Sequence, residues 1–231
     1  MSEFFRFPHT PHLAWTGARS PRDDKVLSPS EAEALLAGPV VVEEKLDGAN
    51  LGFSVSSDGV LQAQNRGHYL DAPHAGQFAR LPQWLASREE ALFDALGEHL
   101  VAFGEWCAAR HSLGYSALPD WWLVFDVYDR REGRFWSSAR RDAWAAGLKL
   151  SIVPVLFRGA TTSARLKKLV ENSHSAFRDG PLEGVIVRCE SGPWLAGRAK
   201  LVRADFTQQM DEHWRRRSLE WNQVEMASRH R

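Results

Sequence analysis

The chain has 231 residues, of which 44% are hydrophobic and 25% are charged, as is ordinary for a globular protein of one large or two small domains. Its 29 basic and 29 acidic residues give a formal net charge of zero, so no global field attracts a polyanion and any nucleic-acid surface must be a local basic patch. No apolar run approaches the ~20 residues of a membrane span, and the N-terminus, MSEFFRFPHT, does not have the pattern of a secretory signal.

The first third of the chain predicts a helix, a strand and a hairpin. Ser28-Pro29-Ser30-Glu31 has the pattern of a capping box with proline at the first helical position, and predicts a helix through Leu36. The apolar run that follows predicts a strand over 40–45. Alternating residues on both sides of Asp58-Gly59 predict a hairpin over 51–65.

The remaining elements are predicted from the periodicity of their apolar residues. Residues from about 77 to 96 have helical spacing that Pro82 interrupts. Further strands are predicted over 100–106, 122–128, 152–157, 183–188 and 199–203, and further helices over 138–148 and 162–170. Because the strands dominate without a regular βαβ rhythm, we expect an α+β fold with mainly antiparallel sheets.

The segment from about residue 206 differs in character from the rest. It is polar, predicted to be helical, and carries Arg215-Arg216-Arg217. This triplet is either a solvated helix face or a tail that contacts phosphates. We therefore divide the chain into residues 1–205 and a short basic tail, residues 206–231.

The tetrapeptide Lys45-Leu46-Asp47-Gly48 is the first candidate for chemistry. The chain contains only six lysines against 23 arginines. Of these two side chains only lysine can lose its proton and become a covalent nucleophile. Taken alone, the pattern K-x-D-G arises by chance in roughly 3% of chains this long. The structural alternative is a strand that ends in an Asp-Gly turn beside a solvated lysine.

A nucleophilic lysine that acts on a nucleotide also needs carboxylates for a metal, cations for phosphate oxygens and an aromatic ring for the base. The sequence offers one or more candidates for each, although each alone could be a strand-end charge or a core residue. Period-2 spacing places Arg198 and Lys200 on one face of a strand. The candidates are Arg66, Glu105, Phe125, Glu183, Arg198 and Lys200.

In this order, the motifs resemble those of the covalent nucleotidyltransferase superfamily, which comprises ATP-dependent DNA ligases, RNA ligases and mRNA capping enzymes. Lys45-Leu46-Asp47-Gly48 resembles the motif that carries the nucleotide-accepting lysine. The later motifs are matched, over roughly residues 40–203, by Phe103-Gly104-Glu105, Val124-Phe125-Asp126, Glu183-Gly184-Val185-Ile186-Val187 and Arg198-Ala199-Lys200. The resemblance implies an ATP-grasp-like nucleotidyltransferase fold, with mainly antiparallel sheets flanked by helices.

Within the superfamily, the chain is most similar to RNA ligases of the phage RNA ligase 2 type. Glu44-Lys45-Leu46-Asp47-Gly48-Ala49-Asn50 resembles the E-K-x-x-G-A-N of that family, and Arg66 falls where those ligases carry an arginine. Two positions depart from the pattern. Asp47 stands where the phage enzyme has histidine, as in DNA ligases and capping enzymes, and Arg198 stands where lysine is expected.

The resemblance implies a role for each candidate residue. Lys45 attacks the α-phosphorus of ATP, and Arg198 and Lys200 balance charge on that phosphate. Glu183, with Glu105 as a second carboxylate, binds Mg²⁺ or Mn²⁺. The remaining contacts are to other parts of the nucleotide: Glu105 and Arg66 to the ribose, Phe125 and Glu44 to adenine, Asp47 to the 3′-hydroxyl, the lysine or a metal-bound water, and Asn50 to the 5′-phosphate or a metal-bound water.

The implied function is an ATP-dependent polynucleotide ligase, with RNA as the favoured substrate and a place in RNA repair. The alternatives are a DNA ligase or a nick-sealing enzyme of mixed substrates, a capping guanylyltransferase, and a non-catalytic nucleic-acid-binding protein. Fewer than 30 residues follow the last motif, so we expect no OB-fold of about 80–100 residues there.

Partners and location are also expectations. The implied partner is a nucleic acid, and a separate end-healing kinase or phosphatase is a reasonable companion. We expect a monomer without membrane association. Cys107 and Cys189 lie far apart without C-x-x-C spacing, which favours a reduced, cytoplasmic protein.

Overall fold

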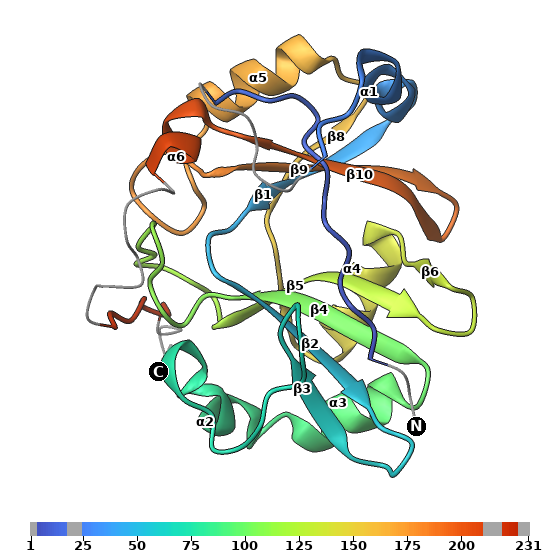
Figure 1. The fold of residues 1–231 in the computed structure, drawn as a ribbon, viewed down its shortest axis with the longest axis vertical. Helices are drawn as coiled ribbons and strands as arrows, with labels where there is room; N and C mark the ends of the chain where they lie inside the picture. The colour runs from blue at the N-terminus through green and yellow to red at the C-terminus, as the bar shows by residue number, and fades with distance from the viewer. Residues whose placement is uncertain (1–3, 18–24, 210–218, 226–231) are drawn as a thin grey trace, which may run out of the picture.

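The computed structural model describes residues 4–17, 25–209 and 219–225, and its core consists of two β-sheets. The first sheet is antiparallel and has the strand order β10-β9-β1-β8 (Figure 1). Its strands are β1 (Val40–Lys45), β8 (Val155–Gly159), β9 (Gly184–Ser191) and β10 (Trp194–Val202). Strand β1 lies in the interior of this sheet, which explains why Val40, Val41 and Val42 are all buried.

The second sheet has the order β3-β2-β4-β5-β6, and β7 pairs with β5 in parallel. Its other strand pairs are antiparallel. Its strands are β2 (Ala49–Val55), β3 (Leu61–Gln64), β4 (Leu100–Trp106), β5 (Trp122–Asp129), β6 (Arg134–Phe135) and β7 (Ser151–Ile152). The two sheets together confirm the predicted α+β class with mainly antiparallel sheets.

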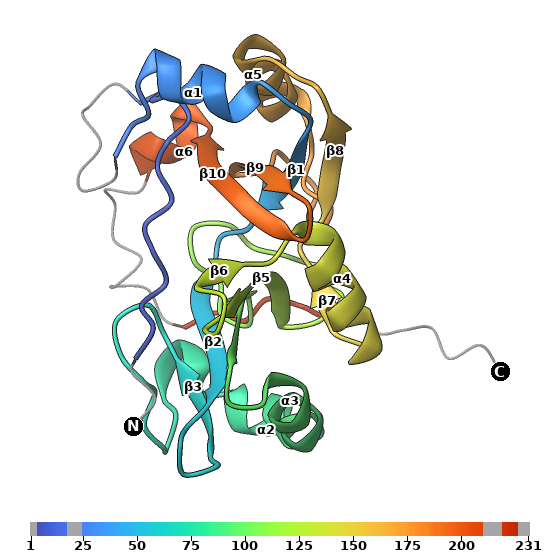
Figure 2. The same ribbon diagram turned by 90° about the vertical axis from the view of Figure 1, so that its right-hand side faces the viewer.

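Helices cover the outer face of each sheet (Figure 2). On the first sheet, Ala32 of α1 (Pro29–Leu36) and Leu166 of α5 (Ser163–Asn172) join a core with the β1 valines. On the second sheet, the apolar residues of two short helices pack against β2 and β4. The remaining helical elements are η1 (Gly76–Phe78), α2 (Leu81–Leu85), α3 (Glu89–Leu96), α4 (Ser138–Gly147) and α6 (Ala204–Gln209).

Local signals in the sequence account for several helix boundaries. The predicted capping box is present at α1, where the Ser28 side chain accepts from the Glu31 amide and the Glu31 carboxylate accepts from the Ser28 amide. Thr162 caps α5 with a single bond, in which its side-chain oxygen accepts from the Arg165 amide. Pro82 does not interrupt a long helix but stands in the first turn of α2, a position that tolerates proline.

The strand predicted over 152–157 is two strands that belong to different sheets. Strand β7 pairs with β5 in the second sheet, and β8 pairs with β1 in the first. Pro154 lies between them and has no N–H to donate, while its carbonyl accepts from the Glu44 amide at 2.8 Å. The chain therefore changes sheets at the proline, which apolar periodicity alone does not reveal.

The N-terminal segment runs beside both sheets (dark blue in Figure 1). At the second sheet, the Gln64 side chain donates to the Phe5 carbonyl at 2.8 Å, and Phe7 packs on Phe103. At the first sheet, Lys200 donates to Pro11 and accepts from Leu13 through main-chain groups. Residues 5–13 thus link the two sheets on one side of the molecule.

The C-terminal segment that we predict to be helical is helical only in part among the described residues. Helix α6 begins before it and extends to Gln209, whereas residues 219–225 contain no helix. Arg215-Arg216-Arg217 lies outside the described residues. Among the helices that the structure describes, none has the length and apolar character required to cross a bilayer.

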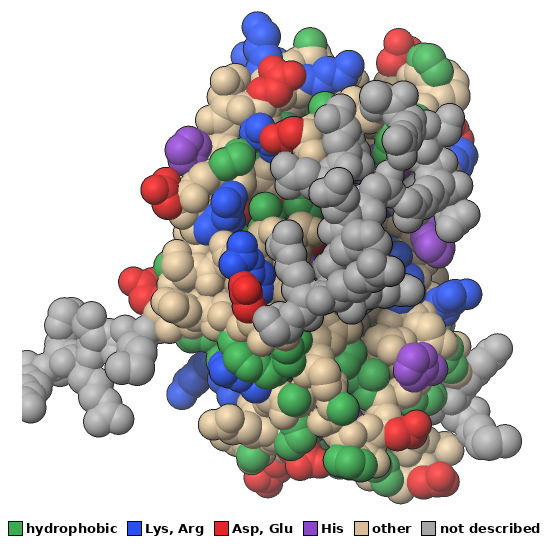
Figure 3. All heavy atoms as spheres, turned by 60° about the vertical axis from the view of Figure 1, so that its left-hand side comes forward, with side chains coloured by type: hydrophobic (Ala, Val, Ile, Leu, Met, Phe, Trp, Pro, Cys, Tyr) green, Lys and Arg blue, Asp and Glu red, His purple; other side chains and the backbone are tan. Residues whose placement is uncertain are grey.

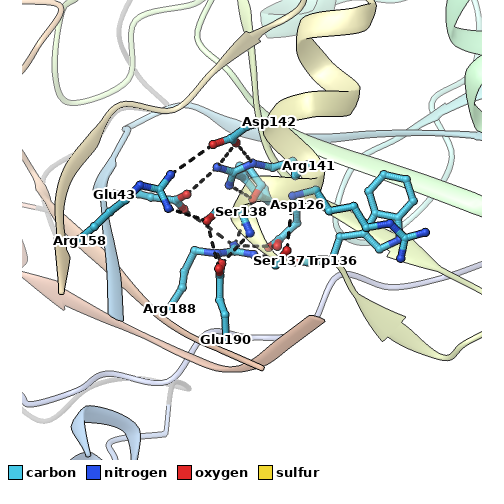
Figure 4. A network of polar contacts seen from close by, with 12 residues as sticks. Glu43, Asp126, Trp136, Ser137, Ser138, Arg141, Asp142, Arg158, Arg188 and Glu190 are labelled. Atoms are coloured by element: carbon cyan, nitrogen blue, oxygen red, sulfur yellow. Dashed lines mark hydrogen bonds and ion pairs between the residues drawn. The ribbon is translucent and has the colours of Figure 1, made fainter. Parts of the chain in front are cut away.

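A buried network of ions joins the two sheets (Figure 4). Arg188 of β9, 1% exposed, pairs with Asp126 of β5 at 2.8 Å and lies 3.8 Å from Glu43 of β1. Arg141 of α4, 0% exposed, pairs with Glu43 at 2.7 Å and donates to the Phe125 carbonyl at 2.6 Å. The junction between the sheets is therefore polar, and its charges are paired within the protein.

We predict that Arg188→Ala lowers the free energy of unfolding by about 3–5 kcal/mol, because it leaves the buried carboxylates of Glu43 and Asp126 without their shared cation. Arg158→Ala is the matched control: Arg158 belongs to the same network but is 49% exposed, so its loss lowers stability by less than about 1 kcal/mol. Urea unfolding of both variants measures the difference. Equal losses would contradict the prediction.

Candidate active site

The geometry of the site begins with the register of β1 and β9. Lys45, the last residue of β1, lies opposite Gly184, the first residue of β9. Glu183, which precedes Gly184 and is 4% exposed, therefore lies beside the lysine, and its Oε1 is 2.5 Å from Lys45 Nζ. A Cβ at Gly184 would lie only 2.4 Å from the Leu201 carbonyl oxygen, so the close approach of β10 requires glycine here.

The turn after Lys45 brings a second carboxylate to the lysine. The Gly48 amide donates to Glu105 Oε1 at 2.9 Å, and β2 and β4 pair so that Asn50 lies opposite Glu105. A Cβ at Gly48 would lie 2.6 Å from the Trp106 carbonyl oxygen. The glycine of the tetrapeptide is thus required by the close contact between the turn and β4.

Asp47 is held by the loop formed by residues 107–118. Its amide donates to the Tyr115 hydroxyl at 2.8 Å, and its Oδ2 accepts from the Leu113 amide at 2.7 Å. Hydrogen bonds therefore hold both the main-chain amide and the carboxylate of Asp47. Because Lys45 precedes Asp47 by two residues, the backbone after the lysine leads to a fixed point.

These elements surround a cavity of about 640 Å³. The structure brings together all ten residues that the sequence identified as site candidates, although they come from both sheets and from the connections between them. The ten candidates that line the cavity are Glu44, Lys45, Asp47, Asn50, Arg66, Glu105, Phe125, Glu183, Arg198 and Lys200.

The lining of the cavity includes an aromatic ring, Phe125, and a buried carboxylate, Glu44. Phe125 is half-buried, and Phe7 contacts it edge-on with a centroid distance of 5.3 Å. Glu44 is buried, its Oε2 accepts from the Ala176 amide at 2.9 Å, and burial raises its pKa. Its Oε1 has no hydrogen-bond partner among the described residues. The cavity therefore offers an aromatic face and an acceptor oxygen, the two groups that a flat ring carrying a donor requires.

Arg198 and Lys200 both line the cavity, but Arg198 is already engaged. Its guanidinium pairs with Asp126, and it lies 4.3 Å from the ring centroid of Phe7 and 4.4 Å from that of Phe135. Burial lowers the pKa of Arg198 despite Asp126. The structure thus connects the arginine that departs from the family pattern to the network between the sheets.

Negative charge is in excess around Lys45. Burial alone would lower the pKa of Lys45, but the charges of Glu183, Glu105 and Asp47 outweigh burial, and its pKa is raised. Burial raises the pKa of Glu183 to about 8 and that of Glu105 to about 7, since the nearby lysine compensates only in part. In this state the lysine is a protonated ion-pair partner, and it must lose its proton before it can act as a nucleophile.

The cavity fits a nucleotide with a divalent cation. Four of the candidate residues have a buried polar atom without a hydrogen-bond partner in the described chain: Glu44 Oε1, Asn50 Oδ1, Arg66 Nε and Glu183 Oε2. Within the described ranges, no group of three or more His, Cys, Asp or Glu side chains is arranged to hold a metal. Glu183 and Glu105 alone are too few ligands, so a magnesium or manganese ion here would also need phosphate oxygens or water.

The sequence analysis missed several residues of the cavity. Phe7, Gln77 and His111 also line it, and His111 Nε2 lies 2.8 Å from Gln77 Oε1. Asp126 was part of a motif, but its role in orienting Arg198 was not predicted. None of these residues stands next to Lys45 in the sequence or carries a local signal, because only the folded chain brings them together.

The fold, two mainly antiparallel sheets flanked by helices, is that of nucleotidyltransferase-type ligases. A family model for RNA ligase matches residues 38–202, so the chain belongs to the RNA ligase family. No curated protein matches the sequence significantly.

Solved structures of ligases have the same fold. The Naegleria gruberi RNA ligase with PPi superimposes with a TM-score of 0.60 at 19% identity, over 78% of this chain and 54% of the other. A mutant of that ligase with AMP and Mn gives a TM-score of 0.59 at 16% identity, over the same shares. A proposed ATP-dependent DNA ligase from Aquifex aeolicus gives 0.54 at 21% identity, over 90% and 52%. The match thus spans about half the length of these proteins, and at these identities it establishes the fold.

We predict that Glu183→Gln lowers the pKa of Lys45, because the substitution removes the charge that most raises it and leaves the burial that lowers it. Without nucleotide, an amine-reactive reagent at pH 8–9 should then label Lys45 faster than in the unmodified protein, as peptide mass spectrometry can measure. Glu171→Gln, at an exposed position of α5, is the control and leaves Lys45 labelling unchanged. Slower labelling in Glu183→Gln would contradict the assignment.

Proposed function

We propose that this chain is an ATP-dependent polynucleotide ligase that joins RNA ends through a lysyl-AMP intermediate. The observation that carries the proposal is that Lys45 and Lys200 line one cavity together with two carboxylates and a half-buried aromatic ring. The carboxylates are those of the buried Glu183 and the half-buried Glu105, and the ring is that of Phe125. Membership of the RNA ligase family supports it. The solved Naegleria gruberi RNA ligase mutants with ATP and Mn, or with AMP and Mn, support the choice of nucleotide and of a divalent metal.

The proposed nucleotide position follows from the polar atoms of the cavity. Adenine stacks on Phe125 and donates its exocyclic amine to Glu44 Oε1, which has no partner among the described residues. Glu105 and Arg66 contact the ribose hydroxyls. The α-phosphate then lies near Lys45, where Asn50 and Lys200 also line the cavity.

The proposed reaction consists of three successive nucleotidyl transfers. First, neutral Lys45 Nζ attacks the α-phosphorus of ATP and pyrophosphate leaves. Second, a 5′-phosphate oxygen of the polynucleotide attacks the same phosphorus, and the lysine nitrogen leaves and regains a proton. Third, a 3′-hydroxyl attacks the phosphorus of the 5′-phosphate, forms the new phosphodiester and releases AMP. One pocket serves all three steps, because each develops charge on phosphate oxygens held at the same place.

The charges of the site suggest how the first step begins. Glu183 and Glu105 would hold a divalent metal together with phosphate oxygens or water, and the ion would supply positive charge that opposes protonation of the lysine and stabilises phosphate oxygens. Glu183 would then no longer hold the lysine as an ammonium ion. We assign charge balance at the α-phosphate to Lys200 and Arg198, which both line the cavity, with Asp126 orienting the Arg198 guanidinium.

RNA is the favoured substrate, and DNA is the alternative. The family match and the E-K-x-x-G-A-N-like string 44–50 favour RNA. Asp47 and the fold of the Aquifex aeolicus protein favour DNA. Figure 3 shows basic and acidic side chains interspersed over the described part of one face, so charges of both signs border the path of a polynucleotide across that part. A kinase or phosphatase that prepares 5′-phosphate and 3′-hydroxyl ends is the proposed partner in RNA repair.

We predict that incubation with α-labelled ATP and Mg²⁺ or Mn²⁺ transfers label to the protein, and that Lys45→Ala abolishes the transfer because the nucleophile is lost. Lys167→Ala, at an exposed position of α5, is the matched lysine control and is labelled like the unmodified protein. Gel autoradiography and peptide mapping measure the result. If the Lys45→Ala protein takes up label equally well, the ligase proposal fails; labelling by GTP rather than ATP would point to a capping-type enzyme.

A second prediction concerns the polynucleotide. A nicked duplex with an RNA 3′-hydroxyl strand and an RNA 5′-phosphate strand should be sealed faster than an all-DNA nick of the same sequence, or than single-stranded RNA. Denaturing gels follow the joined strand and the adenylylated 5′ end. Faster sealing of the all-DNA nick would replace the RNA assignment by the DNA alternative.

A further inference from the structure

A short segment near the C-terminus, residues 219–225, lies against the loop that holds Asp47. We refer to it as the C-terminal strap. It forms an antiparallel bridge between Trp221 and Ala109 and a parallel bridge between Val224 and Leu118. Main-chain hydrogen bonds of 2.8–3.1 Å connect strap residues 220, 222, 223 and 225 to loop residues 108, 110, 115 and 118. The strap is thus built into the loop through its backbone.

Asn222 is the part of the strap that enters the interior. It is 6% exposed, and its side-chain amide makes three hydrogen bonds to the loop backbone. Its Oδ1 accepts from the Tyr115 amide at 2.8 Å, and its Nδ2 donates to the carbonyls of Cys107 and Ala109 at 2.8 and 3.2 Å. Both kinds of polar atom in this side chain are therefore used to fix the loop.

Tyr115 transmits this constraint to the active site. Its amide is held by Asn222, its carbonyl accepts from Gln223 at 3.0 Å, and its hydroxyl oxygen accepts from the Asp47 amide at 2.8 Å. The strap therefore holds both main-chain groups of the residue whose side chain holds Asp47. Asp47 in turn is two residues from Lys45.

The same loop also supports the other side of the lysine. The amides of Ser116 and Ala117 donate to the Phe177 carbonyl, and the neighbouring Ala176 amide donates to Glu44 Oε2. Leu46 packs among Cys107, Tyr115 and Leu118, and Val224 of the strap packs against the same cluster. Residues 44, 46 and 47, on both sides of Lys45, thus depend on a loop that the strap holds.

We infer that Asn222 is a positioning residue for nucleotide transfer at Lys45, acting through Tyr115 and Asp47. The inference rests on the proposed function. Trp221 and Glu220 dock the strap without reaching Tyr115: the Trp221 ring lies 4.2 Å from the Arg80 guanidinium, and Glu220 pairs with Arg110 at 2.7 Å on the surface. Loss of the Asn222 amide therefore leaves the strap docked but frees Tyr115 to shift, and a displacement of about 1 Å at a reacting group lowers a rate by roughly 100-fold.

The test is single-turnover formation of labelled lysyl-AMP by the full chain at saturating ATP. Asn222→Ala and Tyr115→Phe should each lower the rate by about 10- to 100-fold, with the dissociation constant for ATP little changed. Glu220→Gln, on the same strap but exposed, keeps the rate of the unmodified protein. The melting temperature of each variant sets an assay temperature at which every variant is folded.

The double variant Asn222→Ala/Tyr115→Phe separates positioning from a general loss of stability. If both residues act on Asp47 as one unit, the double variant should be about as slow as the slower single variant. Three results would overturn the inference. The rate losses of the two single variants multiply in the double variant, Tyr115→Phe keeps the rate of the unmodified protein, or only the affinity for ATP changes. If Asn222→Ala does not fold, Tyr115→Phe decides alone. Absence of labelling in the unmodified protein would instead reject the proposed function.

Discussion

The junction between the sheets is held by buried ion pairs, and the position of every catalytic candidate depends on it. Taking an ion out of water costs several kcal/mol, so these pairs are maintained only when each charge meets a partner. Among the described residues, four arginines balance four carboxylates in this network, with Arg158 and Asp142 at its more exposed edge. They are Arg141, Arg158, Arg188 and Arg198 with Glu43, Asp126, Asp142 and Glu190. An apolar junction would tolerate sliding of the sheets, whereas directional hydrogen bonds to Asp126 and Phe125 fix one arrangement.

The end of β1 shows how this constraint reaches the chemistry. Three consecutive residues have three different tasks: Glu43 joins the ion network, Glu44 lies at the proposed base-binding end, and Lys45 meets Glu183. Alternation along a strand places residues 43 and 45 on one face and residue 44 on the other. A rigid strand end therefore sets the separation between the nucleophile and the base-binding end without any flexible connection.

The sequence left two interpretations of Lys45-Leu46-Asp47-Gly48: a reactive lysine, or a strand end beside a solvated lysine. Strand β1 ends at Lys45, and the connection to β2 bends at Gly48, where the close contact with Trp106 requires glycine. The lysine, however, is not a solvated neighbour of that bend, since Glu183 pairs with it and Glu105 and Asp47 raise its pKa. The sequence also predicted that Arg198 shares a strand face with Lys200. It did not predict the pairing of Arg198 with Asp126, which makes the arginine part of the network between the sheets.

The sequence by itself determined most of the strands, the capped helices α1 and α5, the motif order and the ten candidate residues, because these depend on local periodicity and on residue chemistry in a fixed order. It did not determine the break at Pro154 between β7 and β8, or the division of residues 76–96 into short helices. Only the tertiary structure decided which carboxylates flank Lys45, that Arg198 pairs with Asp126, and that Phe7, Tyr115 and Asn222 support the site. These facts come from contacts between residues more than 60 positions apart, such as Asp47 with Tyr115. No local pattern encodes such contacts, because the packing of two sheets creates them.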